Sequence, residues 1–209
     1  CEALNLPIMR RCIGGGATFL DSNQIFYQCI FHSSRVPWRA DKLYQMMLNA
    51  PVNVLNRIGL KGSLRAVNEV EAKSVRIAGI GGGRVGEAMI VVGNLLLDFD
   101  YSLMSRVWKV PDQTFRDLAL ETIEERVGTL NKLGCNHTLE SLEYFLTEAF
   151  SESLERPVHK AQLEREEILA GRNTAIDLAS SEFLSLHRPE GEVKPMKSLK
   201  ISANVFIHH

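Results

Sequence analysis

The chain has 209 residues, 45% of them hydrophobic, and a formal net charge of −1. This length and composition suffice for a hydrophobic core in one large domain, with or without a fragment of a second. The chain lacks the basic surplus of a nucleic-acid-binding domain, and no apolar run reaches the ~18 residues that cross a bilayer. We therefore expect neither nucleic acid nor a membrane as a partner.

The four cysteines are scattered along the chain, at Cys1, Cys12, Cys29 and Cys135. They lack the paired spacing of a zinc site or a disulfide framework. The chain does not open on a charged segment followed by an apolar one, as a secretory signal would. These features favour a reducing cytoplasm and predict no metal site.

Residues 10–21 read RRCIGGGATFLD and separate two β-rich runs, residues 6–13 and 24–32. These runs predict neighbouring strands of one sheet. Three glycines in a row let main-chain N–H groups approach an anion, and two arginines add permanent positive charge. An ordinary turn flanked by solvated arginines is the alternative.

Helical spacing of apolar residues predicts a helix over residues 39–59, ended by Gly59 and kinked at Pro51. Further helices are expected over residues 101–107, 112–125 and 138–154. A last helical region over residues 163–186 is expected to divide at Gly171 and Asn173. Strands are expected over residues 74–80 and 88–99.

A second glycine-rich segment, residues 79–86, reads GIGGGRVG between these two expected strands and predicts a loop. Its Gly81-x-Gly83-x-x-Gly86 spacing matches the dinucleotide-binding fingerprint, with Asp98 and Asp100 about 20 residues downstream. A nicotinamide- or flavin-dependent oxidoreductase is therefore one alternative. Against it, residues 88–93 read AMIVVG, a β-branched run where the fingerprint needs a helix.

The whole pattern resembles the lipoate–protein ligase A family, relatives of biotin ligases and octanoyltransferases. Residues 10–21 are similar to its Arg-Arg-x-x-Gly-Gly-Gly-x-x-x-His-Asp signature. Residues 93–100 (GNLLLDFD) and 126–130 (RVGTL) are similar to Gly-Thr-Leu-Leu-x-Asp-x-Asp and Arg-Val-Thr-Asn-Leu. The resemblance covers about residues 1–155 and implies an α+β fold, with mixed or antiparallel sheets flanked by helices.

The resemblance also implies a two-step reaction. ATP, with Mg²⁺, would activate lipoate or octanoate to an acyl-adenylate, and the acyl group would then pass to a lysine of an acceptor domain. The implied acceptors are lipoyl domains of the 2-oxoacid dehydrogenase E2 or glycine-cleavage H protein type. A relative that binds lipoyl groups or their adenylate without catalysis is the non-enzyme alternative.

Site residues follow from the resemblance, position by position. Arg76 aligns with a family lysine that stabilises charge on the carboxyl and phosphoryl oxygens, and Asn68-Glu69 with an Asn-Asp pair. For Glu69, a position as a solvated loop acid that binds no ligand is an equally weighted alternative to a role in ligand binding. The remaining residues implied for substrate or adenylate binding are Arg11, Gly14, Gly15, Gly16, Ala17, Phe19, Gly79, Val92 and Gly93.

Three positions depart from the family pattern: Arg76 replaces lysine, and Leu20 and Val92 replace histidines. Arginine keeps the charge but spreads it over a planar head, so this substitution is not conservative. Lys73 is three residues away and would point to the other face of a strand. The departures put ordinary ligase chemistry in question while leaving the fold assignment intact.

For domain organisation, we expect a ligase-like catalytic domain over residues 1–187 and a linker over 188–196. Residues 197–209 are expected to begin a C-terminal strand or accessory domain, which a separate chain could also supply. The family carries about one helix and two strands upstream of the arginine pair. We therefore expect an N-terminal part of the catalytic domain to precede Cys1.

Overall fold

The computed structural model describes residues 1–13, 17–186 and 194–209. Residues 14–16, the three glycines of the first motif, and residues 187–193 lie outside the described part of the chain. The chain divides into two units. The larger unit comprises residues 13–158 and 195–209, and the smaller comprises residues 1–12 and 159–194.

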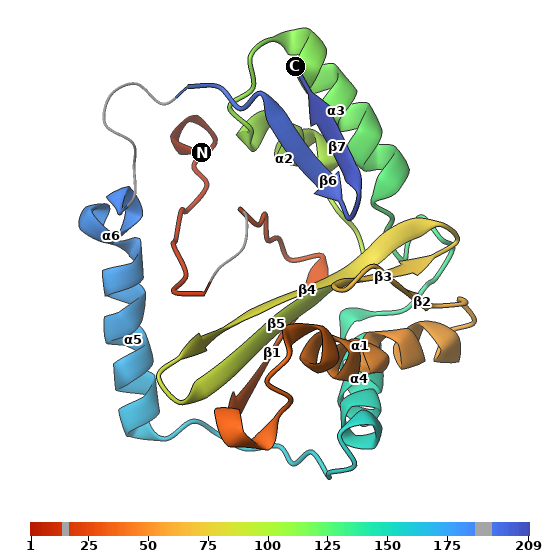
Figure 1. The fold of residues 1–209 in the computed structure, drawn as a ribbon, viewed down its shortest axis with the longest axis vertical. Coiled ribbons are helices and arrows are strands. Elements are labelled where there is room, and N and C mark those ends of the chain that lie inside the picture. Colours follow the sequence, from red (N-terminus) through yellow and green to blue (C-terminus); the bar gives the residue numbers. More distant parts are fainter. Residues whose placement is uncertain (14–16, 187–193) are drawn as a thin grey trace. The chain divides into compact units, whose positions relative to one another are not determined.

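An antiparallel sheet of five strands is the centre of the larger unit (Figure 1). Its strand order is β1-β5-β4-β3-β2, and β4 and β5 form a hairpin that turns at Gly86, where φ is +57°. The positive φ explains the glycine there, because residues with a β-carbon rarely adopt it. The strands are β1 (Gln24–His32), β2 (Ser63–Arg65), β3 (Glu69–Ala72), β4 (Val75–Val85) and β5 (Ala88–Leu96).

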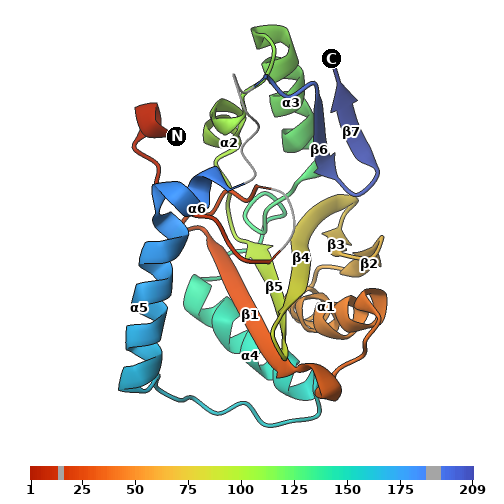
Figure 2. The ribbon, with the colours of Figure 1, turned by 60° about the vertical axis from the view of Figure 1, so that its left-hand side comes forward.

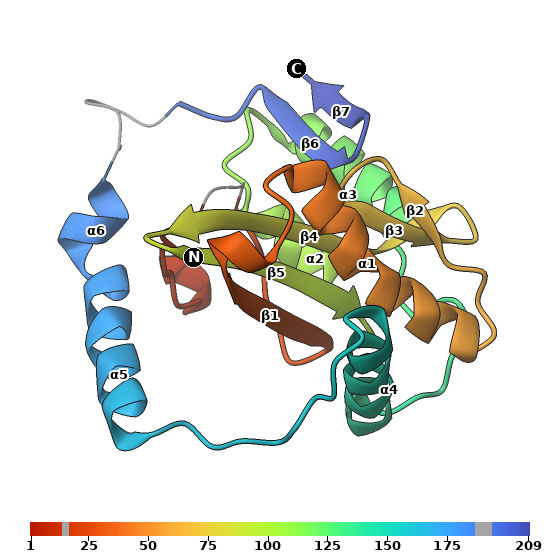
Figure 3. The same ribbon diagram turned by 60° about the horizontal axis from the view of Figure 1, so that its bottom comes forward.

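Helices α1 (Ala40–Arg57) and α4 (Leu139–Ser153) pack side by side against the sheet (Figure 3). Successive strand residues face opposite sides, so alternate residues of β1 and β5 point toward these helices. On β1 these include Ile25 and Tyr27, and Tyr27 packs edge-on against Phe150 of α4 with ring centroids 5.0 Å apart. This face of the sheet and the two helices enclose the main hydrophobic core.

A second hydrophobic cluster joins the helices that follow β5 to a C-terminal hairpin (Figure 2). Asp100 and Asp112 accept hydrogen bonds from Leu103 N and Phe115 N, which caps the first turns of the two helices. The apolar side of the hairpin, including Leu199 and Ile201, is buried in this cluster. The elements are α2 (Tyr101–Val107), α3 (Gln113–Arg126), β6 (Ser198–Ser202) and β7 (Val205–His208).

The smaller unit contains α5 (Arg165–Ala179) and α6 (Ser181–Ser185), together with the N-terminal segment. Arg10 ties the two parts of this unit together. Its main-chain N–H donates to Leu178 O at 3.3 Å, and its Nη2 donates to Leu184 O at 3.0 Å. The short 3-10 helices of the chain are η1 (Glu2–Leu4) and η2 (Ser33–Arg35).

The α+β fold, with an antiparallel sheet flanked by helices, is confirmed, and α2 has the predicted bounds. Three local predictions are wrong. Residues 6–13 form no strand, so this run does not pair with β1. Helix α5 continues through Gly171 and Asn173 and ends only before Ser180. Residues 81–85, expected in a loop, lie inside β4, where cross-strand pairing with β5 holds them extended.

A membrane span is not found among the helices of residues 1–13, 17–186 and 194–209, none of which is long and apolar enough.

The core side of β1 predicts an alkaline weakness in folding. Burial raises the pKa of Cys29 from 9.0 to about 11 and raises the pKa of Tyr27 well above 10. Between pH 9 and 11 the unfolded chain therefore binds fewer protons than the folded one, so the free energy of unfolding should fall as pH rises. Urea midpoints at pH 8 and pH 10.5 measure this loss.

Variants of Cys29 and Tyr27, with Cys12→Ala as a control, show which side chain causes the loss of stability. Cys29→Ala should reduce the pH dependence, whereas the exposed Cys12→Ala should leave it unchanged. Tyr27→Phe should unfold at pH 8 with the same or a higher midpoint, because the Tyr27 hydroxyl is buried without a partner among the described residues. Equal midpoints at the two pH values for the unmodified chain would contradict the prediction.

Candidate functional site

The face of the sheet opposite α1 and α4 has a stripe without side chains. Gly79, Gly81 and Gly83 alternate along β4, so their missing side chains would all project from this face. Gly82, between them, points the other way, because a β-carbon there would lie 3.4 Å from the Tyr44 ring of α1. We call Gly79, Gly81 and Gly83 the glycine floor.

Apolar side chains border the glycine floor on β5 and β1. Across the β4–β5 pairing, Gly81 lies opposite Val92 and Gly83 opposite Ile90. On β1, Phe26 and Ile30 are on the same face and are 49% and 62% exposed. A β-carbon on Gly83 would meet Ile13 at 3.3 Å, while one on Gly81 would meet no described atom within 4 Å. The side-chain space of Gly79 is taken by the Arg76 guanidinium, because a β-carbon there would lie 2.5 Å from Arg76 Nη2, and the polar Asn94 lies opposite Gly79 on β5. The floor therefore has apolar borders at Gly81 and Gly83, and only the space above Gly81 is free of described atoms.

A cavity of about 210 Å³ lies at the Gly79 end of the floor. We call it the Arg76 pocket. One side of the pocket is lined by residues of β3, β4 and the turn before β3, and the other by residues of the hairpin strand β6. Its lining residues are Asn68, Glu69, Arg76, Gly79, Ile80, Lys200, Ile201 and Ser202.

Arg76 and Glu69 form a partly buried ion pair in this pocket. Arg76 Nε lies 3.8 Å from Glu69 Oε1, and the two side chains are 28% and 5% exposed. Burial lowers the pKa of Arg76 while the Glu69 carboxylate acts in the opposite direction, and the guanidinium stays protonated. Glu69 Oε1 also accepts a 2.8 Å hydrogen bond from Ala203 N, which links the pair to the hairpin.

The main chain of Arg76 is held on both sides. Its strand pairs with β3 at Glu71, and its carbonyl accepts a 2.9 Å hydrogen bond from Gly128 N. Gly128 permits this close approach, because a β-carbon there would lie 2.3 Å from Val75 Cγ2. The RVGTL motif therefore fixes the strand that presents Arg76.

Three buried polar atoms of the pocket have no hydrogen-bond partner among the described residues: Glu69 Oε2, Arg76 Nε and Ser202 Oγ. Leaving such atoms unpaired costs about 1–3 kcal/mol each, so native proteins nearly always pair them with protein, water or ligand. Their convergence in one cavity indicates a site built for a polar ligand. The guanidinium gives that ligand's oxygens a fixed positive charge.

Most of the chain matches the model of a known protein family. The family model "Lipoyl protein ligase A/B catalytic domain" matches residues 1–151. The chain belongs to this family. The match covers every strand of the large sheet and the helices α1–α3, together with most of α4.

Known relatives agree with this assignment. The chain is 26% identical over 176 residues to lipoate-protein ligase A subunit 1 of Thermoplasma acidophilum, a match covering 79% of this chain and 66% of that protein. It spans less than half of the bacterial lipoate–protein ligases that it also matches.

Solved structures share the fold. A bipartite lipoate protein ligase of T. acidophilum, described with its E2 lipoyl domain, has a TM-score of 0.81 at 24% identity, over 90% of this chain and 74% of that one. A lipoate-protein ligase A bound with ATP has a TM-score of 0.72 at 21% identity, over 87% and 73%.

The lipoyl-ligase fold brings together four of the predicted site residues. Asn68, Glu69, Arg76 and Gly79 line one pocket. Val92 lies farther along the same face, opposite Gly81. Gly93 is on the other face, where a β-carbon would lie 2.3 Å from Tyr27 Cζ. Its side-chain position is therefore occupied by core packing.

The remaining predicted residues come from the first motif. Gly14, Gly15 and Gly16 lie outside the described residues, and Ala17 is exposed. The Phe19 ring packs edge-on against Phe99, with centroids 5.8 Å apart, and the Phe19 carbonyl accepts a hydrogen bond from Gln24 Nε2. Arg11 belongs to the smaller unit. Roles for these residues in binding stay predictions.

Lys73, expected on a strand, lies outside the strands. It lies in the turn between β3 and β4 at φ +49°, and its Nζ donates to Leu133 O at 3.2 Å. It does not line the Arg76 pocket. Among the residues that the structure describes, no group of three or more His, Cys, Asp or Glu side chains could hold a metal ion.

Sequence reasoning missed the hairpin wall of the pocket, Lys200, Ile201 and Ser202. Residues 197–207 were expected to begin a strand, but nothing in their sequence predicts contact with Glu69. It also missed the glycine floor, for which a signal exists. The two-residue spacing of Gly79, Gly81 and Gly83 predicts one bare face of a strand once residues 79–83 are assigned to β structure.

Proposed function

We propose that the chain is the catalytic part of a lipoate–protein ligase-type acyltransferase. In the first step, a carboxylate oxygen of lipoate or octanoate attacks the α-phosphorus of ATP, and pyrophosphate leaves. In the second step, the amine of an acceptor lysine attacks the carbonyl carbon of the acyl-adenylate. An amide forms, the amine loses a proton, and AMP leaves.

The observation that carries the proposal is the continuity of the glycine floor with the Arg76 pocket. An acyl-adenylate can lie against main chain above Gly81, with its apolar tail beside Val92 and Phe26. Its carboxyl–phosphoryl junction would then lie toward Arg76. A preorganised cation at that junction is the largest contribution a protein can make to such a reaction.

The residues present fit ATP and Mg²⁺ in kind. Glu69 Oε2 is buried and unpaired among the described residues. Carboxylate oxygens, together with substrate phosphates, are usual Mg²⁺ ligands. In this proposal Asn68 and Glu69 would hold Mg²⁺, which would neutralise phosphate charge when bound. Arg11, Ala17, Phe19 and the glycines 14–16 keep their predicted place in adenylate binding.

Acceptor and organisation are also proposed. The acceptor is a lipoyl domain of the E2 or H protein type, consistent with the relative described with its E2 lipoyl domain. We further propose a cytoplasmic location and a division into a catalytic domain, a linker near residues 188–196, and a C-terminal accessory part. The hairpin at residues 198–208 would begin that part, although its contacts group it with residues 13–158.

A non-catalytic lipoyl or adenylate binder is the second candidate, and one observation favours it. Arg76 already faces the carboxylate of Glu69, which offsets the charge that catalysis would use. The oxidoreductase alternative is not retained, because strand β5 begins directly after the turn at Gly86, where the dinucleotide fingerprint requires a helix.

Two measurements on the same protein separate the candidates. Incubation with ATP, Mg²⁺ and lipoate or octanoate should release pyrophosphate, and a supplied lipoyl domain should gain the mass of the acyl group. A domain whose acceptor lysine is replaced by arginine should gain none. Saturable binding of the acyl-adenylate without pyrophosphate release or acyl transfer would favour the binder.

A further inference from the structure

The C-terminal hairpin contributes three lining residues, Lys200, Ile201 and Ser202, to the Arg76 pocket, although the other lining residues lie at positions 68–80 of the chain. The contact is specific, because Ala203 N donates to Glu69 Oε1 at 2.8 Å and both groups are buried. The strand β6 also departs from regular pairing with β7 between Lys200 and Ser202. That irregularity leaves both Ile201 and Ser202 buried.

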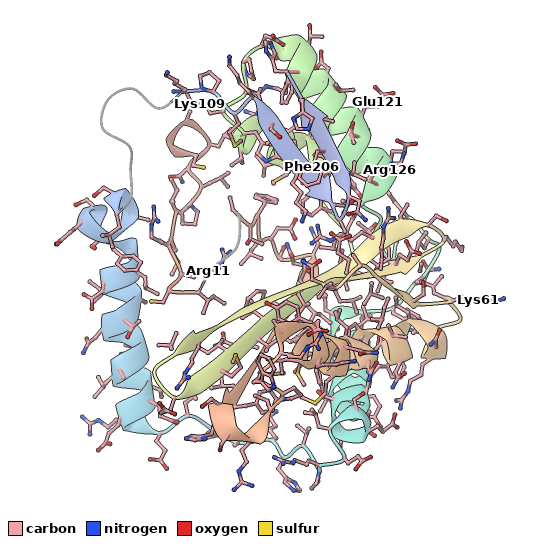
Figure 4. All side chains as sticks on the ribbon, viewed as in Figure 1. Arg11, Lys61, Lys109, Glu121, Arg126 and Phe206 are labelled. Carbon is pink, nitrogen blue, oxygen red and sulfur yellow. The ribbon has the colours of Figure 1, made fainter. Side chains whose placement is uncertain are left out.

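A charge balance shows what the hairpin adds. Of the described residues that line the pocket, only Glu69, Arg76 and Lys200 carry a formal charge. Glu69 and Arg76 offset each other at 3.8 Å. The net positive charge available to an anionic ligand is therefore that of Lys200. Its ammonium lies 5.7 Å from the ring centroid of Phe206, which is on β7 (Figure 4).

We propose that the β6–β7 hairpin is part of the ligand site, with Lys200 and Ser202 as binding residues for the anionic junction of the acyl-adenylate. The assignment rests on the proposed function. Lys200 supplies the positive charge that the Glu69–Arg76 pair lacks. Ser202 Oγ, buried and unpaired among the described residues, supplies a hydrogen bond to a ligand oxygen.

The two residues should respond differently to substitution. Lys200 is exposed, so Lys200→Ala should leave folding intact while removing a charged contact. Ser202→Ala removes a hydroxyl that makes no hydrogen bond with the described residues, so the melting temperature should stay constant or rise. A residue with a purely structural role would not lose ligand affinity at unchanged or higher stability.

The experiment is calorimetric titration of the full chain with 5′-O-(N-octanoylsulfamoyl)adenosine, a non-hydrolysable acyl-adenylate analogue that is anionic at neutral pH. Lys200→Ala should weaken binding at least about tenfold and flatten its dependence on salt, as loss of a charge-assisted contact does. Ser202→Ala should weaken binding by roughly two- to tenfold. Lys200→Arg should retain most of the affinity.

Matched controls come from the same hairpin. Lys197→Ala removes an exposed lysine that does not line the pocket, and Phe206→Leu removes the ring beside Lys200. Neither should change affinity more than about twofold. If the unmodified chain fails to bind the analogue, the proposed function is overturned. If it binds while Lys200→Ala and Ser202→Ala bind equally well, the hairpin assignment alone is overturned.

Discussion

Arg76→Ala should lower the rate of acyl-adenylate formation by about 10²–10³-fold, the usual effect of removing one preorganised donor from an acyl-transfer site. The reason is geometric. The strand that presents Arg76 is held by β3 on one side and by Gly128 on the other. The main chain from which the Arg76 guanidinium extends into the pocket is therefore fixed. Pyrophosphate release from ATP and octanoate measures the rate.

Folding must be separated from chemistry in this variant, because Arg76→Ala leaves Glu69 buried without its cation. The double variant Arg76→Met with Glu69→Gln removes both charges at similar size. It should fold like the unmodified chain and remain as slow as Arg76→Ala. Arg76→Lys keeps the charge and should be faster than Arg76→Ala. Arg84→Ala, which removes an exposed arginine paired with Glu87, should keep full activity. Full activity in the double variant would show that Arg76 has no part in the reaction.

Gly81→Leu should abolish measurable adenylate binding while preserving the fold. The position above Gly81 is open, because a β-carbon there would meet no described atom within 4 Å. A leucine side chain therefore has room to extend from the sheet, and it would occupy the space that the proposed ligand needs. Titration with the acyl-adenylate analogue and a thermal unfolding curve test both halves of the prediction.

The neighbouring residue Gly82 provides a control in which stability should change. A β-carbon on Gly82 would lie 2.6 Å from Ile90 O, a main-chain atom that cannot move without disturbing the β4–β5 pairing. Gly82→Ala should therefore destabilise the protein by about 1–3 kcal/mol, as overpacking does. If Gly81→Leu bound the analogue normally, the ligand could not lie on the glycine floor.

The sequence predicted the elements whose signals are local. Apolar spacing placed α1, and the predicted helices over residues 112–125 and 138–154 begin at Asp112 and Thr138, which cap α3 and α4. Through the family resemblance, the sequence also predicted one site that includes Asn68, Glu69, Arg76 and Gly79. These four residues come from adjacent strands or the turn before them, so their proximity follows from the sheet itself.

What the sequence could not predict depends on distant partners. Residues 6–13 are β-rich, yet Arg10 bonds to carbonyls of α5 and α6 instead of joining a sheet. Residues 79–83 have loop composition, but pairing with β5 and the contact of Gly83 with Ile13 make a glycine-rich strand stable. The link between Ala203 and Glu69 joins residues 134 positions apart, and no local pattern encodes it.

In the proposed site, the glycine floor also restricts where selectivity for the length of the acyl tail can evolve. The glycines of the floor have no side chains that could limit the length of an acyl tail. Discrimination between short and long tails would fall to the bordering strands, through Phe26 and Ile30 on β1 and Ile90 and Val92 on β5. Substitutions there could retune the accepted tail while the polar end of the site stays unchanged.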